Sequence, residues 1–202
     1  MNPRVLRRFI ILLFVATLVV ATVTVFYDSV FVRPPGDYET ERGDNLLSGG
    51  DYEGALSYFD EALAIAPKHR GAMMGRALVF IATGRYAEAI AELDALIAYL
   101  NETLAPDDPT GRGALAAAYA NRGIVEDREA RYRTALADYI KALQIDDEAV
   151  AGPGIVHKIL YDPRPSTVRD RARYLYEQLK LPEAKRVLRV PELDAKQRMY
   201  KP

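Results

Sequence analysis

A short pattern recurs along the chain and constrains its fold more than any other feature of the sequence. Residues 50–56 read GDYEGAL, residues 84–90 read GRYAEAI and residues 130–136 read ARYRTAL. Each copy consists of a turn residue, a tyrosine, and the start of an amphipathic stretch with a small alanine at its centre. The first two copies are 34 residues apart, and a fixed period of this length is typical of stacked helix–turn–helix units. The sequence therefore predicts an all-α solenoid.

Small residues recur with the tyrosines because two helices approach closely only where a small side chain lies at the crossing. In the first unit these residues are Gly43, Ala55 and Ala62, and Phe59 is among the larger side chains around them. A single hairpin leaves an apolar face uncovered, so it needs neighbours. We expect three successive hairpins, with helices at about 37–48 and 52–65, 69–83 and 86–104, and 112–129 and 132–145.

On these residues the chain resembles a tetratricopeptide-repeat (TPR) protein, closely over residues 36–149 and more distantly over 165–198. Arginine replaces the leucine that the TPR pattern places before the small residue, at Arg42, Arg76 and Arg122. The resemblance implies a TPR-like helix–turn–helix solenoid of three clear repeats and a degenerate C-terminal one. It also implies a function in holding another protein.

The N-terminus carries an apolar segment. Residues Phe9 to Tyr27 contain no charge and no glycine, and 19 residues make a helix of roughly 28 Å, close to the ~30 Å hydrocarbon core of a bilayer. Three arginines precede this span and Asp28 follows it, which favours an N-terminus on the cytoplasmic side. A cleaved signal peptide is the alternative, with Val19-Val20-Ala21 as the cleavage site.

These features predict five segments. They are a cytoplasmic tail (1–8), a transmembrane helix (9–27), a proline-containing linker (28–36), repeats 1–3 (37–149) and a basic helical cap (150–202). The linker contains Arg33-Pro34-Pro35-Gly36, which is stiff and extended. The predicted location is the bacterial inner membrane, with the repeats in the periplasm.

Between the second and third repeats the spacing is longer. Ala89 and Ala135 are 46 residues apart, 12 more than the period. The extra residues predict longer helices and a loop around 104–111, with Asp107 or Thr110 as the cap of the next helix.

The C-terminal region is predicted as a degenerate fourth repeat. Ser166 is the expected N-cap of its first helix, Pro182 the expected start of its second, and a short helix is possible at 155–161. The tail from Gln197 to Pro202 is predicted to be polar and adaptable. The basic side chains that are expected to form the cap are Arg169, Arg171, Arg173, Lys185, Arg186 and Arg189.

The sequence offers little chemistry. It has no cysteine, which excludes disulfides, zinc–thiolate sites and thiol nucleophiles. The two histidines, His69 and His157, lack neighbouring residues that would make a catalytic or metal site, and no phosphate-binding loop or hydrolase motif occurs. We therefore predict no enzyme activity, no cofactor and no metal site, and no binding of nucleic acid.

The expected functional surface is the concave groove that the leading helices of the repeats line. Its predicted lining residues are Asp44, Leu47, Met74, Leu78, Ile81, Asn121, Ile124 and Arg128. TPR domains that hold the C-terminal carboxylate of chaperones use Lys or Arg and Asn at these places in neighbouring helices. This chain has Asp44 and the apolar Met74, Leu78 and Ile81 instead, which disfavours that ligand. Residues 34–150 carry 11 basic and 21 acidic side chains, and residues 151–202 carry 12 and 6. A groove of this kind fits an amphipathic or basic helix or an extended segment, unless the chain's own C-terminal helices cover it.

Two functions remain open. The first is a membrane-anchored scaffold, adaptor or assembly factor for a protein client of the cell envelope. The alternative is a permanent accessory subunit of a larger respiratory or photosynthetic membrane complex, whose other subunits would be its partners.

Overall fold

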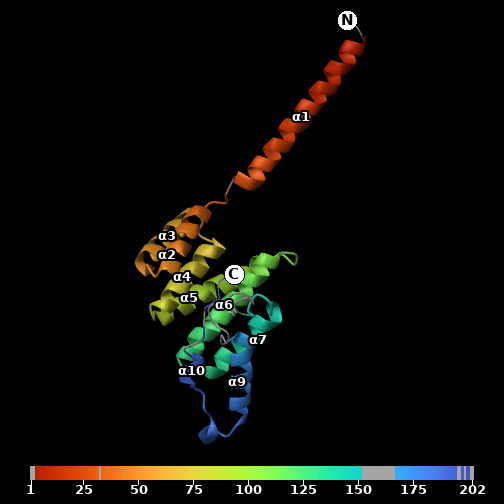
Figure 1. The fold of residues 1–202 in the computed structure, drawn as a ribbon. Helices are drawn as coiled ribbons and strands as arrows, with labels where there is room; N and C mark the ends of the chain where they lie inside the picture. The colour runs from red at the N-terminus through yellow and green to blue at the C-terminus, as the bar shows by residue number, and fades with distance from the viewer. Residues whose placement is uncertain (1–2, 32, 152–166, 195–196, 198, 201–202) are drawn as a thin grey trace.

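The computed structural model describes residues 3–31, 33–151, 167–194, 197 and 199–200. Its first element, α1 (Pro3–Phe31), stands away from all the other helices (Figure 1). The window Leu6–Thr24 has a mean hydropathy of 2.2, and none of it is buried. The predicted helix is therefore present. It continues past Asp28 to Phe31, so the non-helical linker is shorter than the predicted 28–36.

Three antiparallel helical hairpins follow α1 and stack in chain order (Figure 1). The first pairs α2 (Asp37–Gly49) with α3 (Tyr52–Ile65). The second pairs α4 (Arg70–Ala82) with α5 (Tyr86–Thr103), and the third pairs α6 (Pro109–Arg128) with α7 (Tyr132–Ile145). Each helix packs on the next one along the chain. The six helices expected from the repeat pattern are confirmed, and their ends lie within three residues of the predicted ones.

The recurring tyrosines occupy equivalent positions in the three hairpins. Tyr52, Tyr86 and Tyr132 are each the first residue of a trailing helix, and the alanine three residues later is fully buried each time. Two residues before each tyrosine the backbone is left-handed, with φ of 82° at Gly50, 75° at Gly84 and 62° at Ala130. The same turn therefore closes all three hairpins.

Glycines on the leading helices let large side chains pass between helices. The ring of Phe59 on α3 is fully buried. A Cβ built at Gly43 of α2 would lie 2.6 Å from this ring, and a Cβ at Gly75 of α4 would lie 2.3 Å from it. Tyr139 on α7 lies in the same way against Gly123 of α6, where a Cβ would be 2.8 Å from its ring. The small residues in the repeat pattern are thus required by these close contacts.

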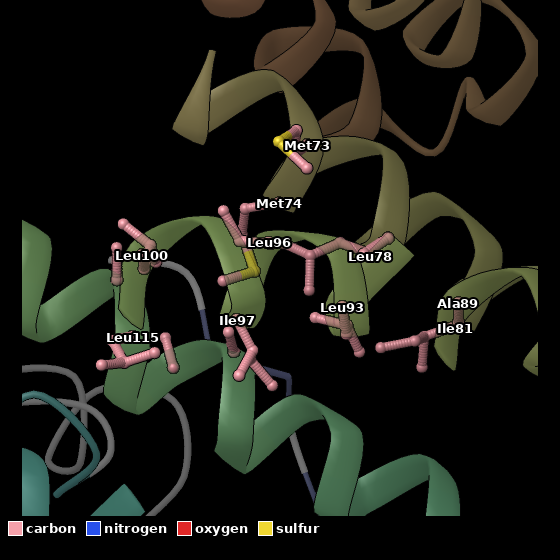
Figure 2. Packing of buried hydrophobic residues seen from close by; sticks show 14 of the residues in the cluster. Met73, Met74, Leu78, Ile81, Ala89, Leu93, Leu96, Ile97, Leu100 and Leu115 are labelled. Atoms are coloured by element: carbon pink, nitrogen blue, oxygen red, sulfur yellow. The ribbon is translucent and has the colours of Figure 1, made fainter. Parts of the chain in front are cut away.

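The largest hydrophobic core lies between the second and third hairpins (Figure 2). Side chains of α4, α5 and α6 point toward one another there, among them Met74, Leu78, Leu96 and Leu115. A smaller core around Phe59 joins the first and second hairpins. Another joins α6 and α7 to the C-terminal region. The continuous series of cores is what a stack of mutually covering hairpins requires.

The loop between the second and third repeats ends in a helix cap. Asp108, and not Asp107 or Thr110, is the N-cap of α6, because its carboxylate accepts the Gly111 N–H at 2.7 Å. Arg70 donates to the same carboxylate at 2.7 Å. The hydrogen bond from Gly111, followed by that from Arg70, lowers the pKa of Asp108. Pro109 then occupies the first turn, where its missing N–H costs nothing.

The C-terminal region has one full helix where a hairpin was predicted. Helix α9 (Val168–Lys180) packs on α7 in the position of a fourth leading helix. Its N-cap is Thr167, and not Ser166, since the Thr167 hydroxyl accepts the Asp170 N–H. The predicted short helix at 155–161 lies outside the described residues.

The trailing helix that was predicted from Pro182 is absent from residues 182–190. The chain instead forms a single 3₁₀ turn, η1 (Glu183–Lys185), and then runs without regular structure to the short α10 (Pro191–Asp194). Side chains of α9 bind the backbone there. Gln178 accepts the Val187 N–H at 2.8 Å, and the Tyr174 hydroxyl donates to the Val187 carbonyl at 2.6 Å. These side-chain hydrogen bonds take the place of the backbone hydrogen bonds that a helix would form at Val187.

Candidate functional site

Three of the predicted groove residues form part of the core. Met74, Leu78 and Ile81 on α4 are only 2, 3 and 1% exposed. They pack against α5 and α6, as Figure 2 shows for Met74 and Leu78 beside Leu96. In this structure the three side chains are thus not free to contact a client. A charged substitution at Leu78 would disturb folding before it could report on binding.

The remaining predicted groove residues divide between core and surface. Ile124 is fully buried in the cluster between α6, α7 and α9. Leu47 on α2 is partly buried against two cores, and Asp44 one turn earlier is also partly buried. The carbonyl of Arg128, at the end of α6, accepts a hydrogen bond from Arg189. Asn121 remains, and it makes the most informative contact of the set.

Asn121 holds the C-terminal segment of the chain in the groove. Its side chain is fully buried. The Asn121 Oδ1 accepts the backbone N–H of Tyr200 at 2.8 Å, and its Nδ2 donates to the Tyr200 carbonyl at 2.6 Å. The side chains of Met199 and Tyr200 pack on the core of α4, α5 and α6. The prediction of a polar, adaptable tail is therefore wrong for these two residues.

The tyrosine side chain of this segment is also held. The Val168 N–H at the start of α9 donates to the Tyr200 hydroxyl at 3.1 Å. Burial raises the pKa of Tyr200 above its ordinary value. Tyr200 packs against the core of α4, α5 and α6 (the α4–α6 core) and also against the core of α6, α7 and α9 (the α6–α9 core). One side chain thus contacts both of the cores that meet at the leading helix α6.

A buried polar network anchors the same region. Arg171 on α9 donates to both carboxylate oxygens of Asp127 on α6, at 2.7 and 2.8 Å. The Tyr139 hydroxyl donates to Asp127 at 3.2 Å, and Gln197 donates to the Tyr139 hydroxyl at 2.6 Å. Burial raises the pKa of Tyr139 well above its usual value, and the charge of Asp127 adds to this effect. Tyr139 therefore remains a donor.

The predicted basic cap is not one surface. Arg171 is 3% exposed and paired with Asp127, and burial alone would lower its pKa, but the contacts with Asp127 raise it. Arg186 is partly buried and donates to the Leu181 carbonyl at 2.9 Å. Arg169 pairs with Asp147, while Arg173, Lys185 and Arg189 are exposed. Arg171, Arg186 and Arg189 thus bind other parts of the fold, the last through the Arg128 carbonyl.

Two of the three arginines that depart from the TPR pattern, Arg76 and Arg122, bridge successive helices. Arg76 on α4 bonds Asp60 of α3 at 2.8 Å and Glu92 of α5 at 2.7 Å. Arg122 on α6 bonds Asp138 of α7 and Asp94 of α5, each at 2.7 Å. The hydrogen bonds that Arg122 donates to Asp138 are the main reason that the pKa of Arg122 is raised. In the sequence these arginines stand out only as departures from the repeat pattern, and the pattern does not predict this role.

A cavity of about 830 Å³ lies where the linker meets the solenoid, lined by Pro34, by residues 66–71 and by Thr110 of α6. At its edge His69 accepts the Ala72 N–H as N-cap of α4, and its Nε2 lies 2.7 Å from Asp37 Oδ1. His69 therefore has a structural role, whereas His157 lies outside the described residues. Across the described part of the chain, three or more potential metal ligands do not gather anywhere.

Stacked hairpins with closely packed leading and trailing helices define a helix–turn–helix solenoid. The family model described as tetratricopeptide repeat matches residues 40–109, which span most of α2 to the start of α6. Residues 40–109 are thus similar to tetratricopeptide repeats, and helices α2 to α7 form a TPR-like solenoid. This fold is a protein-interaction scaffold. No curated protein matches the chain in sequence.

Solved structures show the same fold. The first TPR domain of Spaghetti (RPAP3), bound to an HSP90 peptide, is 15% identical with a TM-score of 0.52, and the match covers 73% of this chain and 94% of that one. The Sgt2 TPR domain from Aspergillus fumigatus is 19% identical, also with a TM-score of 0.52, and the match covers 77% and 89%. At these identities the likeness shows the architecture alone.

Proposed function

We propose that this protein is a membrane-anchored scaffold that holds a protein client of the bacterial cell envelope. One observation carries the proposal: a wholly exposed apolar helix is joined, through a short linker, to a TPR solenoid. Exposed apolar side chains on a 19-residue window are unfavourable in water and favourable in a bilayer. The rest of the described chain folds as stacked hairpins around its own buried cores.

The charges around the apolar window support an orientation. Arg4, Arg7 and Arg8 precede the uncharged run from Phe9 to Tyr27, and no lysine or arginine follows this run until Arg33. Positive charges favour the cytoplasmic side, so the solenoid faces the periplasm. Anchoring confines the scaffold and its client to the same membrane and raises their effective concentration.

The anchor is tested by fractionation. Full-length protein should remain with inner-membrane vesicles after a wash at high salt or alkaline pH. A reporter that is active only in the periplasm, fused after Pro202, should be active. A mature chain that begins near Thr22 and leaves the vesicles in the wash would show that the apolar segment is a cleaved signal peptide.

Client binding is tested by purification of the tagged full-length chain in mild detergent. An adaptor should recover its client at less than one copy per chain, with salt-sensitive binding. Recovery of a fixed set of proteins at one copy each would instead support a permanent subunit of a larger membrane complex. If no protein is enriched over a chain carrying only residues 1–36, the scaffold proposal is wrong.

A further inference from the structure

The contact between Asn121 and Tyr200 has the geometry of a ligand site. Two hydrogen bonds of the buried Asn121 amide go to backbone atoms of Tyr200. Backbone atoms are common to every extended peptide, so this contact does not require the chain's own sequence. The Asn121 Nδ2 also lies 3.4 Å from the sulfur of Met74 on the neighbouring leading helix. The amide thus lies at the junction of α4 and α6.

Side chains of the segment add selectivity at three positions. Tyr200 fills the space between the α4–α6 core and the α6–α9 core, and its hydroxyl accepts the Val168 N–H at 3.1 Å. Met199 packs on the α4–α6 core. Gln197 donates to the Tyr139 hydroxyl at 2.6 Å. A peptide that matches these contacts needs an amide donor, then an apolar side chain and a tyrosine two and three residues later.

Charge favours a basic ligand. Residues 195–202 read AKQRMYKP, with three basic side chains and no acidic one. The repeats over residues 34–150 carry ten more acidic than basic side chains. Opposite net charges favour the encounter and the orientation of such a segment.

The described residues of the segment are not fully buried. Gln197, Met199 and Tyr200 all remain partly exposed, and the chain before α10 lacks regular structure from Arg186 to Val190. A weak contact within one chain can still keep a site filled, because the tether supplies a high effective concentration. A client of the same chemistry with more contacts can replace it.

We propose that the groove around Asn121 is a binding site for an extended, basic protein segment with a Met-Tyr-like pair. Gln197, Met199 and Tyr200 occupy this site as an intramolecular ligand, and they compete with the client. The proposal rests on the proposed function for the client being a protein. It specifies the kind of segment that the client presents, and it identifies the contact between Asn121 and Tyr200 as the one that limits the client's access to the groove.

The test uses full-length protein in mild detergent and a fluorescent peptide of residues 193–202. Wild-type protein should bind the peptide weakly because the site is filled. A chain with Met199→Ser and Tyr200→Ser should bind it at least tenfold more tightly. Adding Asn121→Ala to this chain should remove the gain, as should a Tyr200→Ala change in the peptide. Tyr176→Ser, at an exposed tyrosine of α9, should leave binding at the wild-type level.

Three results would overturn the proposal. One is a Met199→Ser, Tyr200→Ser chain that keeps its helical circular dichroism and melts cooperatively but binds the peptide no better than wild type. A second is loss of cooperative melting in that chain, which would make the segment a structural part of the fold. A third is a wild-type dimer that the two changes dissociate, which would mean that a second copy supplies the segment. None of these measurements involves a membrane or a client, so their failure is separate from failure of the purification test.

Discussion

At the scale of single residues, one hairpin turn lacks the residue that its backbone favours. The three turns share a left-handed residue, which is glycine at positions 50 and 84 and alanine at position 130. A left-handed conformation costs a residue with a Cβ roughly 1–2 kcal/mol, whereas glycine adopts it freely.

Ala130→Gly should therefore stabilise the protein. We expect a gain of about 0.5–1 kcal/mol in the free energy of unfolding, because part of the relieved strain is offset by the greater freedom of glycine in the unfolded chain. Urea denaturation followed by circular dichroism measures it. The reverse change at the equivalent position, Gly84→Ala, should destabilise by about 1 kcal/mol. Equal effects of the same sign at both positions would show that φ at residue 130 is not strained.

At the two glycines that contact Phe59, a glycine is required for space and not for its backbone conformation, so an added methyl group should lower the stability of the protein. Gly75→Ala should destabilise by about 1–3 kcal/mol, since the new methyl would lie 2.3 Å from a ring that is also confined by Gly43. The gain in helix propensity, about 1 kcal/mol, is too small to offset this.

Gly113→Ala on α6 is the matched control, since among the described residues the new methyl would meet Ala149 alone, at 3.7 Å. It should be neutral or stabilise by up to about 1 kcal/mol through helix propensity alone. Thermal melts of the two variants should move in different directions. If Gly75→Ala melts with Gly113→Ala, the space around Phe59 is larger than the structure shows.

At the scale of elements, α1 contributes nothing to the packing of the solenoid. Its apolar window is entirely exposed, and the helix stands apart from the hairpins (Figure 1). A chain that begins at Arg33 should therefore be soluble without detergent and should melt within about 2 °C of the full-length protein, since small stability changes shift the midpoint by only a few degrees. The full-length protein should float with liposomes and the shortened chain should not. A large loss of stability on shortening would mean that α1 packs on the repeats.

The elements that could be predicted from the sequence are those with local signals. Alanine and tyrosine spacing defined α2 to α7, and an uncharged run defined α1, because periodicity and hydropathy reflect which face of a helix is buried. The helix predicted from Pro182 failed for a tertiary reason. Gln178 and Tyr174 bind the backbone of Val187, and no periodic pattern encodes such contacts.

The groove was the least predictable part. Asn121 was identified as a groove residue, but its ligand was not, because that contact joins residues 79 positions apart. Met199 and Tyr200 are the two residues of the otherwise polar tail that have a large apolar surface. They were the signal in the sequence that could have predicted packing of the tail on the repeats. Met74, Leu78 and Ile81 were expected to face a client because the leading helices line the groove. Their burial follows from the close approach of α5 and α6 on one side and the C-terminal segment on the other.

At the scale of the whole molecule, stability should be distributed along the stack. Each helix contacts mainly its neighbours in chain order, and in such a solenoid the free energy of unfolding is close to a sum of local and nearest-neighbour terms. The C-terminal end depends on the Arg171–Asp127 pair, which is 3% and 4% exposed. Removal of one partner of a buried pair leaves an uncompensated charge and costs about 3–5 kcal/mol.

Arg171→Met should consequently loosen one end of the molecule and leave the other intact. We expect the amide hydrogens of α9 and of the second half of α6 to exchange at least tenfold faster, with α2 to α4 unchanged, in hydrogen exchange followed by mass spectrometry. The control is Arg169→Met, which removes the pair with Asp147 whose side chains are 54% and 55% exposed and which should cost less than about 1 kcal/mol. Uniformly faster exchange from α2 to α9 in the Arg171 variant would contradict this expectation, because it would show that the solenoid unfolds as a single unit.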